Sequence, residues 1–128
     1  MKIRFIAIAA VLVTSLGALA PTALAADPQP HSVAALNENR ATLAGKTIQV
    51  AGKVVKVNNG IMGRNFVHVQ DGSGDAATGS NNLIVTSKQT ARVGDQVAVS
   101  GIVVVDRDFG SGYLYPLLIE EASITPKP

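Results

Sequence analysis

The chain has 128 residues, no cysteine and a formal charge of +2. Without cysteine it has no disulfides, thiol catalysis, cysteine-based zinc sites, haem attachment through Cys-x-x-Cys-His or iron–sulfur ligation by cysteine. A hydrophobic core must stabilise the fold, and the content of Val, Ile, Leu and Ala is sufficient for one domain of about 100 residues.

The first 25 residues have the organisation of a secretory signal peptide. Lys2 and Arg4 precede an almost unbroken apolar run over residues 5–19, and Ala23 and Ala25 are small residues at positions −3 and −1 of a cleavage site. The run is short for a membrane span of about 20 residues. We therefore expect cleavage after Ala25 and a periplasmic or secreted product without a membrane span.

The product would keep 103 of the 128 residues, which is the size of one domain. It would carry nine basic and nine acidic side chains, so its formal charge would be zero. A neutral domain has no overall positive field to support non-specific binding of nucleic acid.

Residues 26–45 are expected to form an extended lead-in followed by a short helix. Residues 26–31 contain two prolines, and Ser32 is a suitable N-cap for a helix over Val33–Leu43. Apolar residues recur in this segment at three- and four-residue steps, and Gly45 ends it. We expect the helix to pack on one end of the domain that follows.

Residues 46–125 carry the patterns of strands, and residues 126–128 form a tail. The predicted strands are Lys46–Asn58, Asn65–Gln70, Leu83–Thr86, Gln96–Asp106 and Tyr113–Ile124. Turn residues and a polar, Gly-rich loop at Asp71–Asn82 separate them. Pro116 indicates an edge or a bulge in the last strand, because proline has no N–H for a ladder.

The two longest strands each have a glycine in the middle, Gly52 and Gly101. In the first strand, apolar residues occupy one parity at Ile48, Val50 and Val54 and the other at Val55 and Val57. A glycine beside such a change indicates a strong bend or a bulge. We predict an all-β protein, a five-stranded Greek-key barrel of the OB type with a short N-terminal helix. An SH3-like barrel is the alternative, but it does not explain the length of the first and fourth strands.

Three phrases, VAGKVVKVN, GRNFVHVQDGSG and VGDQVAVSGIVV, resemble the OB-fold domain of the tRNA-anticodon-binding type over about Lys46–Ile124. The whole sequence is similar to small exported bacterial OB-fold proteins that are called DNA- or nucleotide-binding by analogy of fold. The resemblance implies that Phe66 matches an aromatic residue that stacks on a nucleotide base, and that Asp71 and Gly74 shape the following turn. An export signal departs from the cytoplasmic location of the anticodon-binding domains.

Alternation along Asn65–Gln70 indicates a ligand face. Val67 and Val69 share one side and are expected to be buried, which leaves Phe66 on the other side. We expect Phe66 to be exposed, where it would stack a base or a sugar ring. The alternative is that the N-terminal helix or the Asp108–Gly112 turn covers it. The predicted ligand-binding residues are Arg64, Phe66, His68, Gln70, Lys53 and Lys56, the two lysines adding a modest basic patch.

Metal binding and catalysis have little support in the sequence. The Asp71–Asn82 loop lacks the Glu that closes an EF-hand loop, and His31 and His68 lie on separate elements. The chain has no nucleophile elbow, His-Glu-x-x-His pair or P-loop. We therefore expect no metal, no cofactor and no enzymatic activity. The predicted function is a periplasmic binding module for an envelope protein, a glycan or a small ligand, and the alternative is an OB-fold protein that binds single-stranded DNA or oligonucleotides.

Overall fold

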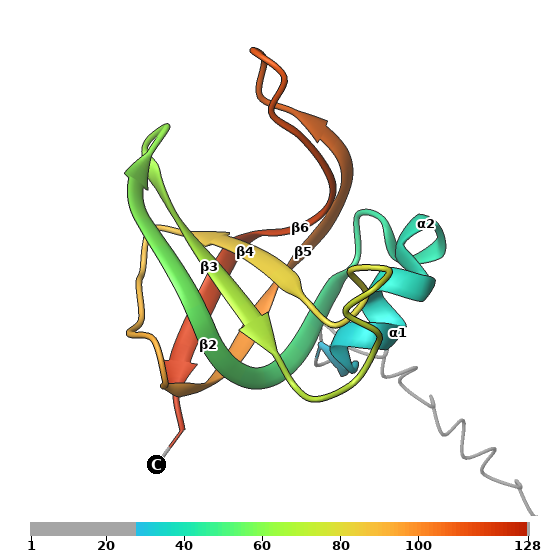
Figure 1. Cartoon of the computed structure of the whole chain (residues 1–128), viewed down its shortest axis with the longest axis vertical. Helices are drawn as coiled ribbons and strands as arrows, with labels where there is room; N and C mark the ends of the chain where they lie inside the picture. The colour runs from blue at the N-terminus through green and yellow to red at the C-terminus, as the bar shows by residue number, and fades with distance from the viewer. Residues whose placement is uncertain (1–27, 128) are drawn as a thin grey trace, which may run out of the picture.

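The computed structural model describes residues 28–127, and the predicted signal peptide lies outside them. The strands are β1 (Gln29–Pro30), β2 (Thr47–Ile61), β3 (Arg64–Gln70), β4 (Leu83–Ser87), β5 (Gln96–Asp108) and β6 (Leu114–Pro126), and the helices are α1 (Val33–Glu38) and α2 (Arg40–Leu43) (Figure 1). The predicted all-β class is confirmed. The predicted count of five strands is too low, because the short β1 adds a sixth.

The six strands form one mixed sheet that closes on itself. Their order is β1-β2-β3-β4-β6-β5, and an additional pairing joins β2 to β5. β4 and β6 are parallel and pair through Val85 and Ile119, whereas the β2–β3, β3–β4, β2–β5 and β5–β6 pairs are antiparallel. The result is a barrel-like ring with the two helices beside it (Figure 1).

One long strand, β2, changes partner along its length. Its first half pairs with β5 from Thr47 to Lys53, and its second half pairs with β3 from Lys53 to Ile61. The change occurs at Gly52, where an added Cβ would lie 2.6 Å from the carbonyl oxygen of Gln70. Only glycine permits the backbone of β3 to approach β2 so closely.

Register shifts lie close to both mid-strand glycines, and the irregularity beside Gly52 was predicted. The β2–β3 register shifts between Val54 and Lys56, and the β5–β6 register shifts opposite Gly101. Val55, where the apolar parity of the strand changes, is 38% exposed. Val55 lies within the register shift, and Val57 beyond it packs against the core.

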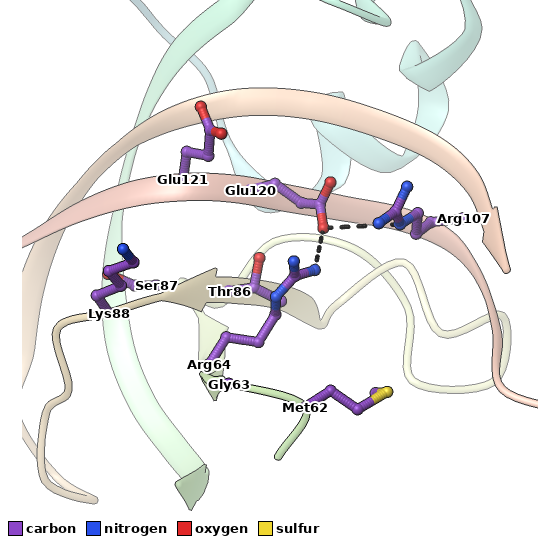
Figure 2. A pocket seen from close by; sticks show the side chains of 9 residues that line it. All are labelled: Met62, Gly63, Arg64, Thr86, Ser87, Lys88, Arg107, Glu120 and Glu121. Carbon is purple, nitrogen blue, oxygen red and sulfur yellow. Dashed lines mark hydrogen bonds and ion pairs between the residues drawn. The ribbon is translucent and has the colours of Figure 1, made fainter. Parts of the chain in front are cut away.

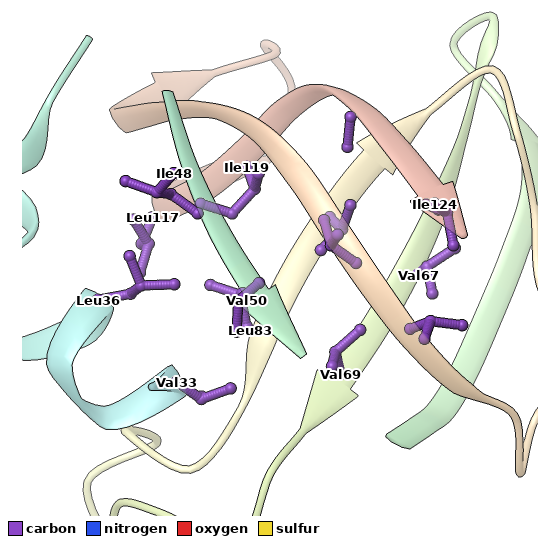
Figure 3. Close-up of a cluster of buried hydrophobic side chains, with 14 of the residues drawn as sticks. Val33, Leu36, Ile48, Val50, Val67, Val69, Leu83, Leu117, Ile119 and Ile124 are labelled. Atoms are coloured by element: carbon purple, nitrogen blue, oxygen red, sulfur yellow. The ribbon is translucent and has the colours of Figure 1, made fainter. Parts of the chain in front are cut away.

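The core lies inside the ring and takes alternate residues from the long strands (Figure 3). Ile48, Val50 and Val54 come from β2, while Val67 and Val69 come from β3 and are fully buried, as predicted. Helix α1 adds Val33 and Leu36 to the same cluster. The helix therefore packs on the strands as expected.

The predicted helix over Val33–Leu43 is interrupted at Asn39, which separates α1 from α2. Asn39 donates hydrogen bonds from its backbone N–H (2.9 Å) and from its side-chain Nδ2 (3.0 Å) to the carbonyl of Ala35, which closes α1. Asparagine favours such local hydrogen bonds over a helix interior. The N-cap prediction is confirmed, because Ser32 Oγ accepts a hydrogen bond from Ala35 N at 3.0 Å.

The polar loop at residues 71–82 holds the start of α1. Asp71 Oδ2 accepts a hydrogen bond from Val33 N, and Ser73 Oγ accepts one from Ala34 N, both at 2.9 Å. The amide of Asn37 donates to carbonyl oxygens of the same loop, at Ser80 and Asn82. The loop therefore supplies acceptors for N–H groups that have no partner within a helix.

The C-terminal tail is shorter than predicted. Pro126 is the last residue of β6, and Lys127 N donates a hydrogen bond to Gln96 O at 2.8 Å. Within residues 28–127 no helix has the length and apolar character needed to cross a membrane.

We expect Asp71→Ala to lower the free energy of unfolding by about 1–2 kcal/mol, the usual cost of losing a helix cap. Glu38→Ala, which removes an exposed carboxylate from α1, should change it by less than about 0.5 kcal/mol. Urea denaturation followed by circular dichroism measures both, and equal effects would show that Asp71 does not hold the helix.

The same contact predicts a pH dependence. Burial alone would raise the pKa of Asp71, but hydrogen bonds from the Ser73 hydroxyl and from the amides of Val33 and Ser73 outweigh it, so the pKa lies below its usual value. A carboxyl group with a lowered folded-state pKa stabilises the fold at pH values above its unfolded pKa of about 3.9. This contribution is lost as the pH falls through the folded pKa. Asp71→Asn should therefore reduce the difference in stability between neutral and acidic pH.

We expect Gly101→Ala to lower the free energy of unfolding by about 1–3 kcal/mol, the usual cost of overpacking. An added Cβ would lie 2.6 Å from Ile119 Cγ2 and 2.9 Å from Glu120 O. Ser100→Ala on the same strand is the control, with an expected change below about 0.5 kcal/mol. If thermal and urea unfolding showed no difference between the two variants, the tight packing at Gly101 would be disproved.

Candidate ligand cleft between two hairpins

Two hairpins extend from the barrel and stand apart in Figure 1. One joins β2 to β3 through Met62 and Gly63, and the other joins β5 to β6 through residues 109–113. A cleft of about 420 Å³ lies between them and reaches the end of β4 (Figure 2). The residues that line it are Met62, Gly63, Arg64, Thr86, Ser87, Lys88, Arg107, Glu120 and Glu121.

An ion pair crosses this cleft from one hairpin to the other. Arg64 Nη1 on β3 lies 2.8 Å from Glu120 Oε1 on β6, and Arg107 Nε on β5 lies 4.0 Å from the same oxygen. Figure 2 shows both guanidinium groups directed at Glu120. The side chains of Arg64 and Glu120 are 32% and 16% exposed, so water reaches both.

Phe109, in the turn of the β5–β6 hairpin, supports both arginines. The guanidinium carbon lies 5.2 Å from the ring centroid for Arg64 and 4.9 Å for Arg107. These distances fall within the range of cation–π attraction. The cleft thus has a pair of guanidinium groups whose positions are fixed by an aromatic ring as well as by a carboxylate.

The expectation that Phe66 is exposed is wrong, because its side chain is only 3% exposed. Its ring centroid lies 6.0 Å from that of Phe109 and 5.7 Å from that of Tyr115, and those two rings are 5.7 Å apart. The Asp108–Gly112 turn contributes Phe109 to this cluster, as the alternative interpretation proposed. A buried ring cannot stack on a nucleotide base without opening the cluster.

Burial of Phe66 means that both faces of β3 are covered at this position. Val67 beside it points into the main core, whereas Phe66 is buried outside that core cluster. Leu118 on β6 is fully buried outside it in the same way, between the core residues Leu117 and Ile119. A second apolar cluster, made of Phe66, Phe109 and Tyr115, therefore lies on the outer side of the sheet and joins β3 to the β5–β6 hairpin.

The other predicted ligand-binding residues lie away from the cleft. Lys56 is opposite His68 and Lys53 is opposite Gln70 in the β2–β3 register. Gln70 Nε2 donates to Asn82 Oδ1 at 3.4 Å, and Asn82 Nδ2 lies 3.3 Å from His68 Nδ1. Of the six predicted residues, only Arg64 lines the cleft, while Lys53 and Gln70 line a separate depression of about 510 Å³.

His68 is half-buried, and burial lowers its pKa, with a further decrease from the positive charge of Lys56. Both effects favour the neutral form of the ring. Among the described residues no group of three His, Asp or Glu side chains is placed to hold a metal ion.

A bulge places two consecutive glutamates, Glu120 and Glu121, along the lining of the cleft. Glu121 has a φ of +50° and lies at the β5–β6 register shift, where two residues of β6 oppose Gly101. In a regular strand consecutive side chains point to opposite faces, but a bulge changes this alternation. Met62, on the facing hairpin, also has a positive φ of 51°. A two-residue hairpin turn accounts for the φ of Met62, since both of its central residues need positive φ, whereas the φ of Glu121 belongs to the bulge.

No protein-family model matches the chain, and no curated protein matches it significantly. Among solved structures, 31 chains match significantly. One, described as an aspartyl-tRNA synthetase from Leishmania major Friedlin, has a TM-score of 0.53 at 13% identity, and the match covers 84% of this chain and 22% of that one. An OBody bound to hen egg-white lysozyme has a TM-score of 0.52 at 20% identity, with 77% and 95% covered.

These likenesses concern the fold alone and are consistent with an OB-like fold. This chain spans about a fifth of the length of the synthetase chain that it matches.

Several residues of the cleft were missed by the sequence interpretation, above all Arg107, Glu120 and Lys88. Arg107 is opposite Tyr115 in the β5–β6 register and lies beside Phe109. A signal was available in the segment LLIEEASI, where two adjacent acids interrupt an apolar strand. Acids at such a position require either solvent or a cationic partner.

Phe66→Ala should lower the free energy of unfolding by about 3–5 kcal/mol, because it removes a buried aromatic side chain. Tyr113→Ala is the control, since this ring is 57% exposed, and we expect a change below about 0.5 kcal/mol. Chemical denaturation measures both. Equal stabilities would mean that the cluster at Phe66 is not formed in solution.

Proposed function

We propose that this protein is a non-enzymatic, exported binding module with an OB-type Greek-key barrel, and that the cleft between its two hairpins is the ligand site. Apart from the two-residue β1, the ring order β2-β3-β4-β6-β5 supports this fold. In OB folds, ligands bind on the face of the second and third strands between two hairpin loops. The β2–β3 and β5–β6 hairpins occupy the equivalent places in the chain order.

The observation that carries the proposal is the position of the charged side chains between the hairpins. Arg64, Lys88 and Arg107 come from three different strands or their ends, yet all of them line one cleft. Charged groups from distant parts of the chain rarely converge unless they neutralise one another or serve a ligand. The lining holds three cations and two acids, so the charges of the cleft do not cancel.

The tips of the hairpins favour a protein or peptide as the ligand. Ile61 and Met62 are exposed on one hairpin, and Tyr113 and Leu114 are exposed on the other. Single exposed apolar residues are normal, but two pairs beside one charged cleft offer both apolar and polar contacts. The OBody of similar fold is bound to a protein, which supports this choice over a glycan or a small molecule.

The experiment compares two double variants that remove the same charge from different surfaces. The protein, purified after expression of the full-length chain, is used to capture ligands from an envelope extract of the source organism. Arg107→Ala with Lys88→Ala should reduce the recovered ligand at least tenfold. Lys53→Ala with Lys56→Ala should retain it, because these lysines lie outside the cleft.

Equal recovery by both double variants would contradict the cleft as the ligand site. Melting temperatures are measured for each protein, so that unfolding is not mistaken for loss of binding. The nucleic-acid alternative is tested with a single-stranded dT oligonucleotide at two salt concentrations. If affinity were high and fell steeply with salt, phosphate contacts would dominate and the alternative would be correct.

A further inference from the structure

We propose that the guanidinium groups of Arg64 and Arg107 form an oxyanion-binding subsite, which Glu120 fills when the cleft is empty and which a carboxylate or phosphate group of the ligand fills on binding. This inference rests on the proposed function, since it assigns a chemistry to the same cleft. It makes Glu120 an internal competitor of the ligand.

The geometry of the three side chains carries the first step. Both arginines approach a single oxygen, Glu120 Oε1, at 2.8 Å and 4.0 Å. The longer separation exceeds a hydrogen bond, so Arg107 makes only a loose contact with the carboxylate. Each guanidinium has several N–H donors in a planar fork, and one carboxylate oxygen cannot satisfy both forks. A ligand oxyanion would use this remaining donor capacity.

The second step is that the arginines remain in place when Glu120 leaves. Each guanidinium lies over the ring of Phe109, at 5.2 Å for Arg64 and 4.9 Å for Arg107. Phe109 in turn packs against Phe66, whose side chain is buried against the sheet. The subsite is therefore held by an aromatic support that does not depend on the carboxylate, and less ordering is needed on binding.

The third step concerns the cost of displacing Glu120. The Arg64–Glu120 pair is partly exposed, so water competes for both groups and the pair contributes little. Displacing it should weaken ligand binding by no more than about fivefold. In exchange, an oxyanion with several acceptor atoms can bind both guanidinium groups. Lys88 brings the cations of the lining to three against two acids, and this excess favours a negative ligand in the same cleft.

The competing interpretation is that Glu120 only pins the two hairpins together. Both roles predict the observed contact, but they predict opposite effects of its removal on anion binding. A pin that is removed would loosen the cleft and weaken binding. A competitor that is removed would strengthen it.

The experiment uses inorganic phosphate and acetate as probes, in separate titrations. The Nε–Hε resonances of Arg64 and Arg107 are followed by NMR in protein purified after expression of the full-length chain, with sodium chloride at matched ionic strength as the reference. We expect saturable shifts with phosphate, acetate or both, and the stronger probe identifies whether the subsite prefers phosphate or carboxylate. Glu120→Gln should tighten binding about fivefold, and Arg107→Gln should weaken it at least tenfold.

Glu38→Gln is the matched control, because it removes one negative charge from an exposed position on α1. If Glu120→Gln bound the probes no more tightly than Glu38→Gln, Glu120 would not be a competitor and the inference would be overturned. If Glu120→Gln failed to fold, the wild-type and Arg107→Gln titrations would decide. Saturable shifts that Arg107→Gln abolishes would support the subsite, and shifts no larger than those in chloride would overturn it.

Failure of the inference and failure of the proposed function are distinguishable. If the cleft double variant loses its captured ligand while neither probe binds, the cleft is a ligand site without an oxyanion subsite. If the probes bind at Arg64 and Arg107 while both double variants capture ligand equally, the subsite exists but the captured ligand does not use it.

Discussion

The bend of β2 at Gly52 is the constraint on which the rest of the structure depends. β2 can pair with both β5 and β3 because Gly52 has no Cβ. A Cβ at this position would lie 2.6 Å from the carbonyl oxygen of Gln70. Gly101 provides the corresponding freedom near the β5–β6 register shift. Once both strands bend, the sheet closes, and their far ends leave the ring as two separate hairpins. The cleft is therefore a consequence of closing a sheet with strands that are longer than the ring requires.

Long hairpins that leave a barrel need support, and the outer aromatic cluster provides it. Phe66 on β3 contacts Phe109 and Tyr115 of the opposite hairpin. Because the ring of Phe66 is buried in this contact, it stabilises the fold and cannot stack on a ligand. It also sets the position of Phe109, on which the two arginines lie. Support for the hairpins and order in the charged cleft thus come from the same three rings.

Local patterns were sufficient to predict much of the fold. Alternation predicted that Val67 and Val69 are buried, and Ser32 was a correct N-cap. The errors arose where contacts between distant residues decide the outcome. Phe66 is covered by the rings of Phe109 and Tyr115, which lie 43 and 49 positions later in the chain. The alternation of residues within β3 contains no information about contacts at such a distance. Most of the candidate cleft was missed for this reason, since Arg64 meets Glu120 across a separation of 56 residues.

The register shift on β6 connects this backbone geometry to the chemistry of the cleft. Without the bulge, Glu120 and Glu121 would point to opposite faces, and one of them would be directed toward the core side that Ile119 and Ala122 occupy. The positive φ of Glu121 is the cost of placing both on the outer side. The same register shift therefore both accompanies the close packing of β6 on Gly101 and places Glu120 where Arg64 and Arg107 reach it.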